Sequence, residues 1–339
     1  MIRSLFILLL ANPAISFAQN NEADREELPI FIRYDNNTIT PIVEFILNGK
    51  TCKAVFDSGS YGLRILSGAV YKRLVDTMAD RVSYTYGDAV NSLHLRGKVA
   101  SAMIRFGHLQ TTAPIRLMVV DSTNYTPAGE WSSTGDSSVI NSAHFRGLPA
   151  ILGVSLRTTT AAKGVASPLS QLPGDGKFIV KFPRLGGNKG RLIVNPEPRE
   201  MEGYTWFQLK PGSDSLPGSS RSWLDNKLNG CLYINGAAIC QPTMLDCGSQ
   251  GITVFSKATT GSYRLPAGTL VTLEIRDSLD SSLKINTSFK IGDNPKRNKD
   301  EVYLKGADKQ EKNVFGLRTF FDFDVLYDQQ NGRIGLKAK

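Results

Sequence analysis

The sequence is poor in the residues that build most metal and thiol centres. It contains only three histidines and four cysteines among 339 residues. His94, His108 and His144 lack the spacing of metal ligands, and no Cys-x-x-Cys pair occurs. The sequence therefore predicts no metal site and no cofactor.

Long apolar runs are also scarce. Only the first residues combine a basic start at Arg3, an apolar core over 5–11 and a small-residue site over 16–18, as a secretory signal peptide does. That run is shorter than the roughly 20 residues that span a bilayer. We predict a signal peptide over 1–18, a loose polar stretch over 19–27, a secreted or periplasmic bacterial protein, and no stable membrane insertion.

Helical periodicity is rare, and residues 67–79 are the best candidate for a helix. Short alternating runs of β-branched and aromatic residues, separated by turns, predict a mostly β protein. The length fits two lobes, over 28–198 and 199–339. Residues 121–142 are expected to form a surface loop, and residues 320–328 alternate like a half-buried strand.

The chain carries a formal charge of +9, from 40 basic and 31 acidic residues. A basic protein can favour an anionic surface such as an envelope lipid. No motif of interleaved basic and aromatic residues accompanies the charge, so we do not expect nucleic-acid binding.

A ten-residue pattern occurs twice, at 57–66 and at 246–255. Both copies read Asp-x-Gly-Ser-x-Gly, followed by alternating apolar residues. Each copy follows a short apolar run, and each run follows an Asn-Gly pair, at 48–49 and at 235–236. The sequence thus predicts a hairpin, a buried strand, an acidic glycine turn and a second strand in each half. Two matched carboxylates in matched halves indicate one shared site.

The second Asn-Gly pair also predicts a disulfide. A two-residue type I′ turn fixes the hairpin register and places Cys231 opposite Cys240 in a non-hydrogen-bonded pair, the kind with closer Cα atoms. Such a pair can form a disulfide in an oxidising compartment. Cys52 and Cys247 are expected to remain as free, buried thiols.

The repeated turns resemble the active-site loops of the pepsin-like, two-lobed aspartic proteases, and the chain looks most like bacterial secreted or periplasmic members without a pro-segment. In that family each lobe contributes one aspartate from an Asp-Thr/Ser-Gly-Ser/Thr turn, and Asp57 and Asp246 fall on those positions. Residues 83–88 resemble the flap, a hairpin that closes over substrate, with Tyr86 as the flap tyrosine and Gly87 beside it.

Two further segments resemble the apolar-apolar-glycine strands that thread behind the aspartate loops in this family. They are residues 147–153 and residues 314–316. With them, the resemblance covers nearly the whole mature chain.

The resemblance implies a mostly β, bilobal fold with the active-site cleft between two similar lobes. It implies an aspartic endopeptidase that cleaves peptide or protein substrates without a cofactor. We expect a monomer, because one chain supplies both aspartates. The serines would hydrogen-bond the carboxylates and the glycines would permit the tight turns. The residues expected to support the pair are Ser58, Gly59, Ser60, Cys247, Gly248 and Ser249.

Two positions depart from the family pattern. Cys247 replaces a Thr or Ser that helps lock the two loops together, and Arg64 replaces a tryptophan that supports the flap tyrosine in many members. Because of these departures, the main alternative is a catalytically inactive binding module of the same fold. One further alternative is a thiol enzyme using Cys247, which would need a histidine base. Another is a β-rich adhesin or envelope structural protein.

Overall fold

The computed structural model describes most of the chain, and within the described part the protein is mostly β, in several sheets. The expected signal peptide over 1–18 and the flap tip at Asp88 lie outside the described residues. Within those residues, no helix has the length and apolar character needed to cross a membrane. The described residues are 25–35, 38–69, 76–87, 92–126, 132–133, 140–215, 221–278, 280, 282–292, 300–307 and 310–339.

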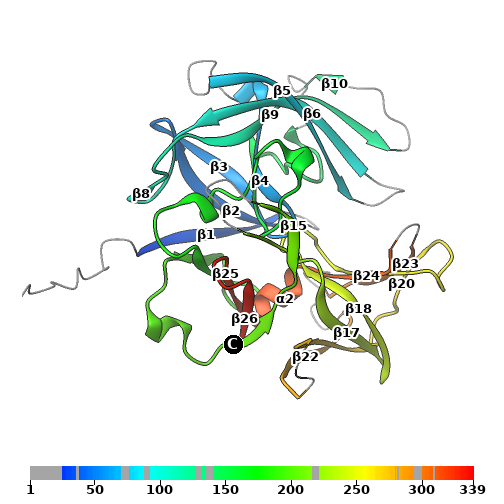
Figure 1. Cartoon of the computed structure of the whole chain (residues 1–339). Coiled ribbons are helices and arrows are strands. Elements are labelled where there is room, and N and C mark those ends of the chain that lie inside the picture. The colour runs from blue at the N-terminus through cyan, green and yellow to red at the C-terminus, as the bar shows by residue number, and fades with distance from the viewer. Residues whose placement is uncertain are drawn as a thin grey trace, which may run out of the picture.

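The first sheet takes strands from both ends of the chain (Figure 1). Three short strands lie off its main path: β7 (Ile104–Phe106), β8 (Leu109–Gln110) and β10 (Ser132–Ser133). The strands of the main path are, in spatial order, β14 (Thr205–Gln208), β26 (Arg333–Ala338), β25 (Phe323–Asp328), β12 (Lys177–Lys181), β13 (Lys189–Val194), β1 (Glu26–Asp35), β2 (Thr38–Leu47), β3 (Lys50–Asp57), β11 (Ala150–Val154), β4 (Tyr61–Leu66), β9 (Ile115–Thr126), β6 (Ser92–Ala102) and β5 (Asp76–Gly87).

The second sheet is built from the second half of the chain alone. Figure 1 shows it at the opposite end of the molecule from β5, β6 and β9. Its strands are, in spatial order, β20 (Ser262–Arg264), β23 (Val302–Gly306), β19 (Ile252–Ser256), β24 (Lys312–Phe315), β18 (Ala237–Leu245), β17 (Leu228–Ile234), β21 (Leu270–Arg276) and β22 (Lys284–Lys290).

The remaining elements are small. Strands β15 (Pro211–Ser215) and β16 (Arg221–Trp223) pair only with each other, and helix α2 (Leu317–Asp322) precedes β25. Four 3₁₀ turns complete the described elements: Ser67–Ala69, Thr160–Ala162, Leu169–Gln171 and Pro198–Met201.

Both predicted Asn-Gly hairpins form. The backbone φ angles are 42° and 87° at Asn48 and Gly49, and 49° and 90° at Asn235 and Gly236. A type I′ turn needs positive φ at both central residues, which Asn and Gly tolerate best. The turns join β2 to β3 and β17 to β18. Each aspartate loop therefore follows a hairpin of the same kind.

The predicted disulfide is confirmed. Cys231 lies opposite Cys240 in the β17–β18 register, and the two are bonded with their Cα atoms 4.0 Å apart. Cys52 and Cys247 are free, but only Cys247 is fully buried. A disulfide is compatible with an oxidising compartment.

The core extends across both sheets. Phe56, Leu245 and Phe315, which come from strands around the two aspartate loops, belong to one continuous apolar cluster. A second cluster, including Leu93 and Phe145, lies under the β5–β6 hairpin. Because interiors pack at crystal-like density, these clusters hold the strand ends that carry the aspartates in fixed positions.

Several sequence expectations need correction. Strand β1 begins at Glu26, within the stretch expected to be loose. The helix expected over 67–79 is wrong. Residues 67–69 form a 3₁₀ turn, and from Asp76 onward the chain belongs to β5, which pairs with β6. Asp121–Thr126, expected in a loop, continue β9, which pairs with β6.

The chain end also differs from expectation. Leu317–Asp322 form α2, whose residues Leu317, Phe320 and Phe321 share one buried face at helical spacing. Only Phe323–Asp328 form the expected strand, and that strand pairs with β12. The first sheet therefore takes strands from both sides of residue 198.

Candidate active site

Two tight loops bring Asp57 and Asp246 together at the ends of two strands. Asp57 ends β3, and Asp246 directly follows β18. The N–H of Gly59 donates to Oδ1 of Asp57 over 2.9 Å, and the N–H of Gly248 donates to Oδ1 of Asp246 over 2.8 Å. Each loop therefore holds its own carboxylate in the same way.

The second oxygen of each carboxylate accepts from a serine of the same loop. Ser60 Oγ donates to Oδ2 of Asp57, and Ser249 Oγ donates to Oδ2 of Asp246 over 2.7 Å. One backbone donor and one hydroxyl thus orient each carboxylate, which fixes the plane of the acid before any ligand binds.

The glycines allow the carboxylates to lie close together. A Cβ atom on Gly59 would lie 2.3 Å from Cγ of Asp246, and one on Gly248 would lie 2.5 Å from Oδ1 of Asp57. These distances are far below van der Waals contact, so any side chain at either glycine would push the loops apart. The two carboxylates share one site because both positions lack a side chain.

Ser58 and Cys247 cross-link the loops. Ser58 Oγ donates to the carbonyl of Leu245 over 3.1 Å, and Cys247 Sγ donates to the carbonyl of Phe56 over 3.3 Å. Each side chain also accepts the backbone N–H of the other residue. The thiol at position 247 therefore occupies the place of a second hydroxyl. The eight loop residues predicted from the sequence all lie together here.

Two strands thread behind these loops. β11 runs between β3 and β4, and β24 runs between β18 and β19. The N–H of Ser155 donates to the carbonyl of Ser60 over 2.9 Å, and the N–H of Leu317 donates to the carbonyl of Ser249 over 3.0 Å. The two expected glycine segments thus support the loops equivalently.

The electrostatics of the site favour a shared proton. Burial, followed by the charge of Asp246, raises the pKa of Asp57 well above the ordinary value for an aspartate. Two adjacent carboxylates, one of them buried, cannot both ionise cheaply. One proton therefore belongs to the pair rather than to either residue.

The thiol of Cys247 has none of the properties of a nucleophile. Its side chain is fully buried, and burial and the nearby charge of Asp57 raise its pKa well above the ordinary value. Reactive cysteines are accessible and have a lowered pKa. We therefore discard the thiol-enzyme hypothesis for this position.

Tyr86 connects the β5–β6 hairpin to the first loop. Its hydroxyl lies 3.3 Å from Ser60 Oγ, the atom that also donates to Asp57. Tyr86 and the neighbouring Gly87 line the cleft beside the carboxylates. Two hydrogen bonds, through Ser60, therefore connect the predicted flap tyrosine to the first aspartate.

Arg64 is buried and lies in a set of three tyrosine rings. Its side chain is only 1% exposed. The guanidinium carbon lies 3.4 Å from the ring centroid of Tyr84 and 5.5 Å from those of Tyr61 and Tyr86. A guanidinium over an aromatic face is stabilised by the ring quadrupole. The partners of this buried arginine are therefore the aromatic rings and the carbonyl of Gly62, to which it donates over 3.2 Å.

Sequence reasoning missed Arg146 and Gln250, which join the first half of the chain to the second aspartate loop. Arg146 donates to the carbonyls of Ala143, Ile39 and Gly248 over 2.9, 3.0 and 2.5 Å. The side-chain amide of Gln250 both donates to and accepts from the backbone of Ile39. No motif marks these residues, because the partners that join the two halves are backbone atoms distant in sequence.

Arg157 was also missed. Its guanidinium forms an ion pair with buried Asp225, with 2.6 Å between Nε and Oδ1, and donates to the carbonyl of Gly59 over 2.8 Å. It therefore fixes the first aspartate loop and gives the cleft a cationic wall. Arg157 follows β11, and no sequence motif marks it.

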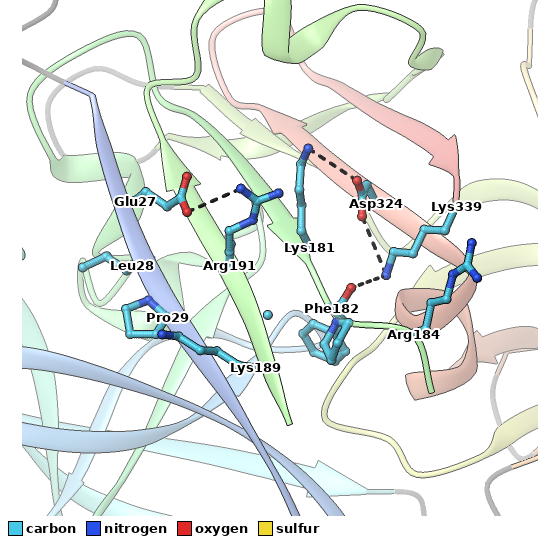
Figure 2. Close-up of a pocket in the computed structure, with 12 residues that line it drawn as sticks. Glu27, Leu28, Pro29, Lys181, Phe182, Arg184, Lys189, Arg191, Asp324 and Lys339 are labelled. Atoms are coloured by element: carbon cyan, nitrogen blue, oxygen red, sulfur yellow. Dashed lines mark hydrogen bonds and ion pairs between the residues drawn. The ribbon is translucent and has the colours of Figure 1, made fainter. Parts of the chain in front are cut away.

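The carboxylates face a cleft of about 410 Å³. A separate groove of about 640 Å³ is larger (Figure 2). In that groove Lys181 and Lys339 both face Asp324, and Arg191 faces Glu27. Its acids are thus paired with cations and are not arranged for acid–base work. The chemistry therefore points to the smaller cleft.

Within the described residues, no group of three or more His, Cys, Asp or Glu side chains is arranged to hold a metal ion. No family model matches the chain, and no curated protein matches it significantly in sequence.

Proposed function

We propose that this protein is a bilobal, pepsin-like aspartic endopeptidase. The observation that carries the proposal is the equivalence of the two loops. Asp57 and Asp246 each accept one glycine N–H and one serine hydroxyl, and the loops are cross-linked by Ser58 and Cys247. A binding module would not need two adjacent carboxylates that destabilise each other.

The chemistry follows from one proton shared by two carboxylates. The ionised member removes a proton from a water molecule that attacks the peptide carbonyl, while the protonated member donates a hydrogen bond to the carbonyl oxygen. The proton then passes to the leaving amine. Because the pair titrates together, we assign neither role to one residue.

The surrounding residues would serve substrate binding. Tyr86 on the β5–β6 hairpin would close over an extended peptide and exclude water. Arg64 would hold that tyrosine from behind. Extended peptides of many sequences could lie along the cleft, so we propose peptide or protein substrates. The disulfide and the apolar N-terminal residues support a secreted or periplasmic location.

A peptide-library cleavage assay would test the proposal. Residues 19–339 would be incubated with diverse peptides between pH 3 and 8, with and without pepstatin, beside the Asp246→Asn variant. We expect pepstatin-sensitive cleavage that is lost in the variant. Ser215→Ala, outside the loops, serves as the matched control. No cleavage at any pH by folded protein would contradict the proposal and favour the binding module.

A further inference from the structure

The larger groove lies on the first sheet, where β1, β13, β12 and β25 are neighbours (Figure 2). In the strand register Pro29 of β1 lies opposite Arg191 of β13, and Arg191 lies opposite Lys181 of β12. Directly opposite residues on neighbouring strands share one face of a sheet. Val180 and Leu192, which alternate with these residues, belong to the main apolar cluster. The groove therefore lies on the face of the sheet that points away from that cluster.

The carboxylates of the groove are shared among its cations. Asp324 lies 3.5 Å from the ammonium of Lys181 and 3.7 Å from that of Lys339. Glu27, the other acid among the described lining residues, lies 3.5 Å from Arg191. Two carboxylates thus face three cations, which leaves this part of the groove positive.

Arg184 and Lys189 add two further positive charges. Arg184 lies in the connection between β12 and β13, Lys189 begins β13, and both side chains are exposed. Within the part of the chain that the structure describes, neither side chain has a hydrogen-bond or ion-pair partner, and both lie beside the groove in Figure 2. These two cations are therefore available to an anion.

Phe31 places an exposed aromatic ring next to these charges. It lies directly opposite Lys189 in the β1–β13 register. Phe31 is 40% exposed, whereas its neighbours Ile30 and Ile32 are buried in the core. A membrane surface can bind both kinds of side chain, because anionic headgroups attract the cations and the ring can enter the boundary with the acyl chains.

The groove has the donors that a phosphate group requires. A guanidinium presents a planar fork that can bind two phosphate oxygens, and an ammonium adds a compact point charge. The volume of about 640 Å³ is that of a small-molecule site. A phosphate-bearing headgroup therefore matches the groove in both charge and size.

We propose that this groove binds the phosphate of an anionic lipid headgroup and holds the protein reversibly at a membrane surface. Arg184 and Lys189 would bind the phosphate oxygens, and Phe31 would enter the boundary between headgroups and acyl chains. The inference goes beyond the proposed function and does not depend on it, because the groove and the carboxylate cleft share none of their described lining residues.

Vesicle sedimentation tests the proposal. Residues 19–339 would be mixed with vesicles of phosphatidylcholine alone, or of phosphatidylcholine and phosphatidylglycerol. We expect the anionic vesicles to bind at least about tenfold more tightly than the zwitterionic ones. Raising the salt from about 50 to 500 mM should weaken that binding, because salt screens exposed charges. Equal or absent binding to the two kinds of vesicle would overturn the proposal.

Variants then locate the site. Arg184→Gln/Lys189→Gln should weaken binding to the anionic vesicles about tenfold or more. Lys98→Gln/Lys257→Gln makes the same change in net charge at two exposed lysines on β6 and after β19, and should leave the binding within about twofold of the wild type. Equal losses in the two double variants would show that net charge alone attracts the protein, and would overturn the assignment to the groove.

Phe31→Ser separates a membrane from a soluble anion. It should weaken vesicle binding about fivefold, because less apolar surface leaves water. Inorganic phosphate and poly-glutamate would be titrated by calorimetry as soluble probes. Binding of either probe without vesicle binding would overturn the lipid assignment and give the groove to a free phosphate or to an acidic protein segment, as would unchanged vesicle binding by Phe31→Ser.

The outcomes separate this inference from the proposed function. A protein that binds anionic vesicles through the groove but cleaves no peptide would keep the lipid site and remove the peptidase. A protein that cleaves peptides but does not bind the vesicles would keep the peptidase and remove the lipid site.

Discussion

Ser58 and Cys247 exchange backbone hydrogen bonds across the two halves of the protein. The N–H of Cys247 donates to Ser58 Oγ over 2.9 Å, and the N–H of Ser58 donates to Cys247 Sγ over 3.3 Å. The arrangement is reciprocal although one partner is a hydroxyl and the other a thiol. The longer distance reflects the larger radius of sulfur, and a thiol is the weaker hydrogen-bonding group. The thiol thus differs from a hydroxyl at this position in hydrogen-bond strength and not in geometry.

Replacing the thiol tests this cross-link. Cys247→Thr should preserve or increase both activity and the free energy of unfolding, because a hydroxyl makes the same contacts more strongly. Cys247→Ala should lower the free energy of unfolding by about 1–3 kcal/mol, because the Phe56 carbonyl and the Ser58 N–H lose their buried partner. Urea denaturation and initial cleavage rates would measure both effects. An inactive but folded Cys247→Thr protein would contradict this role.

The pKa of Asp57 predicts how stability varies with pH. Burial and then the charge of Asp246 raise that pKa from 3.8 to about 7. Between these values the folded protein keeps a proton that the unfolded chain releases, so the free energy of unfolding should fall as pH rises through this window. The slope from one group is at most about 1.4 kcal/mol per pH unit. Below pH 4 this contribution is fully present.

Asp57→Asn removes the titrating group at that position. Urea denaturation at pH 4, 5, 6 and 7 should show a flatter dependence in the variant than in the wild type, and the variant should gain relative stability towards pH 7. Parallel dependences for the two proteins would show that Asp57 does not hold a proton in the folded state.

Arg64 should act on substrate binding through Tyr86. Arg64→Met keeps the bulk but removes the cation over the tyrosine rings, an interaction worth about 1–2 kcal/mol when desolvated. We expect kcat/KM to fall about tenfold, mainly through KM, because the flap tyrosine loses its support. Arg199→Met, at an exposed arginine, is the matched control. Equal kinetics in the two variants would exclude this positioning role.

Arg146 should stabilise the whole site. Arg146→Met leaves the carbonyls of Ala143, Ile39 and Gly248 without their donor, at about 1 kcal/mol or more each. The free energy of unfolding should fall by about 3 kcal/mol, and Arg146→Lys should recover part of it. Thermal or urea unfolding would measure both variants. A loss below about 0.5 kcal/mol would show that these contacts contribute little.

The sequence predicts features that repeat or follow local rules. The Asn-Gly turns require positive φ, so the hairpins and the Cys231–Cys240 pairing could be derived in full. The location of Asp57 and Asp246 in matched loops followed from the repeat. These features depend on short-range backbone geometry, which a local sequence pattern can predict.

Features that depend on tertiary contacts could not be predicted from the sequence. The alternation around Phe320 and Phe321 fits a strand as well as a helix, and only packing decides in favour of α2. Arg146 reaches the carbonyls of Ile39 and Gly248 in distant segments. Arg64 of β4 packs on Tyr84 and Tyr86 of β5, although β9 and β6 lie between these two strands in the sheet. Nothing in the neighbouring sequence encodes such partners.

The central claim is that Asp57 and Asp246 act as one acid–base unit. Cleavage of a single fluorogenic peptide should be compared among the wild type, Asp57→Asn, Asp246→Asn and the double variant. Each single change should reduce kcat by about 10³-fold or more, and the double variant should be no slower than either, since residues that act as a unit are not additive. A single variant with near wild-type kcat, or losses that multiply in the double variant, would contradict the account.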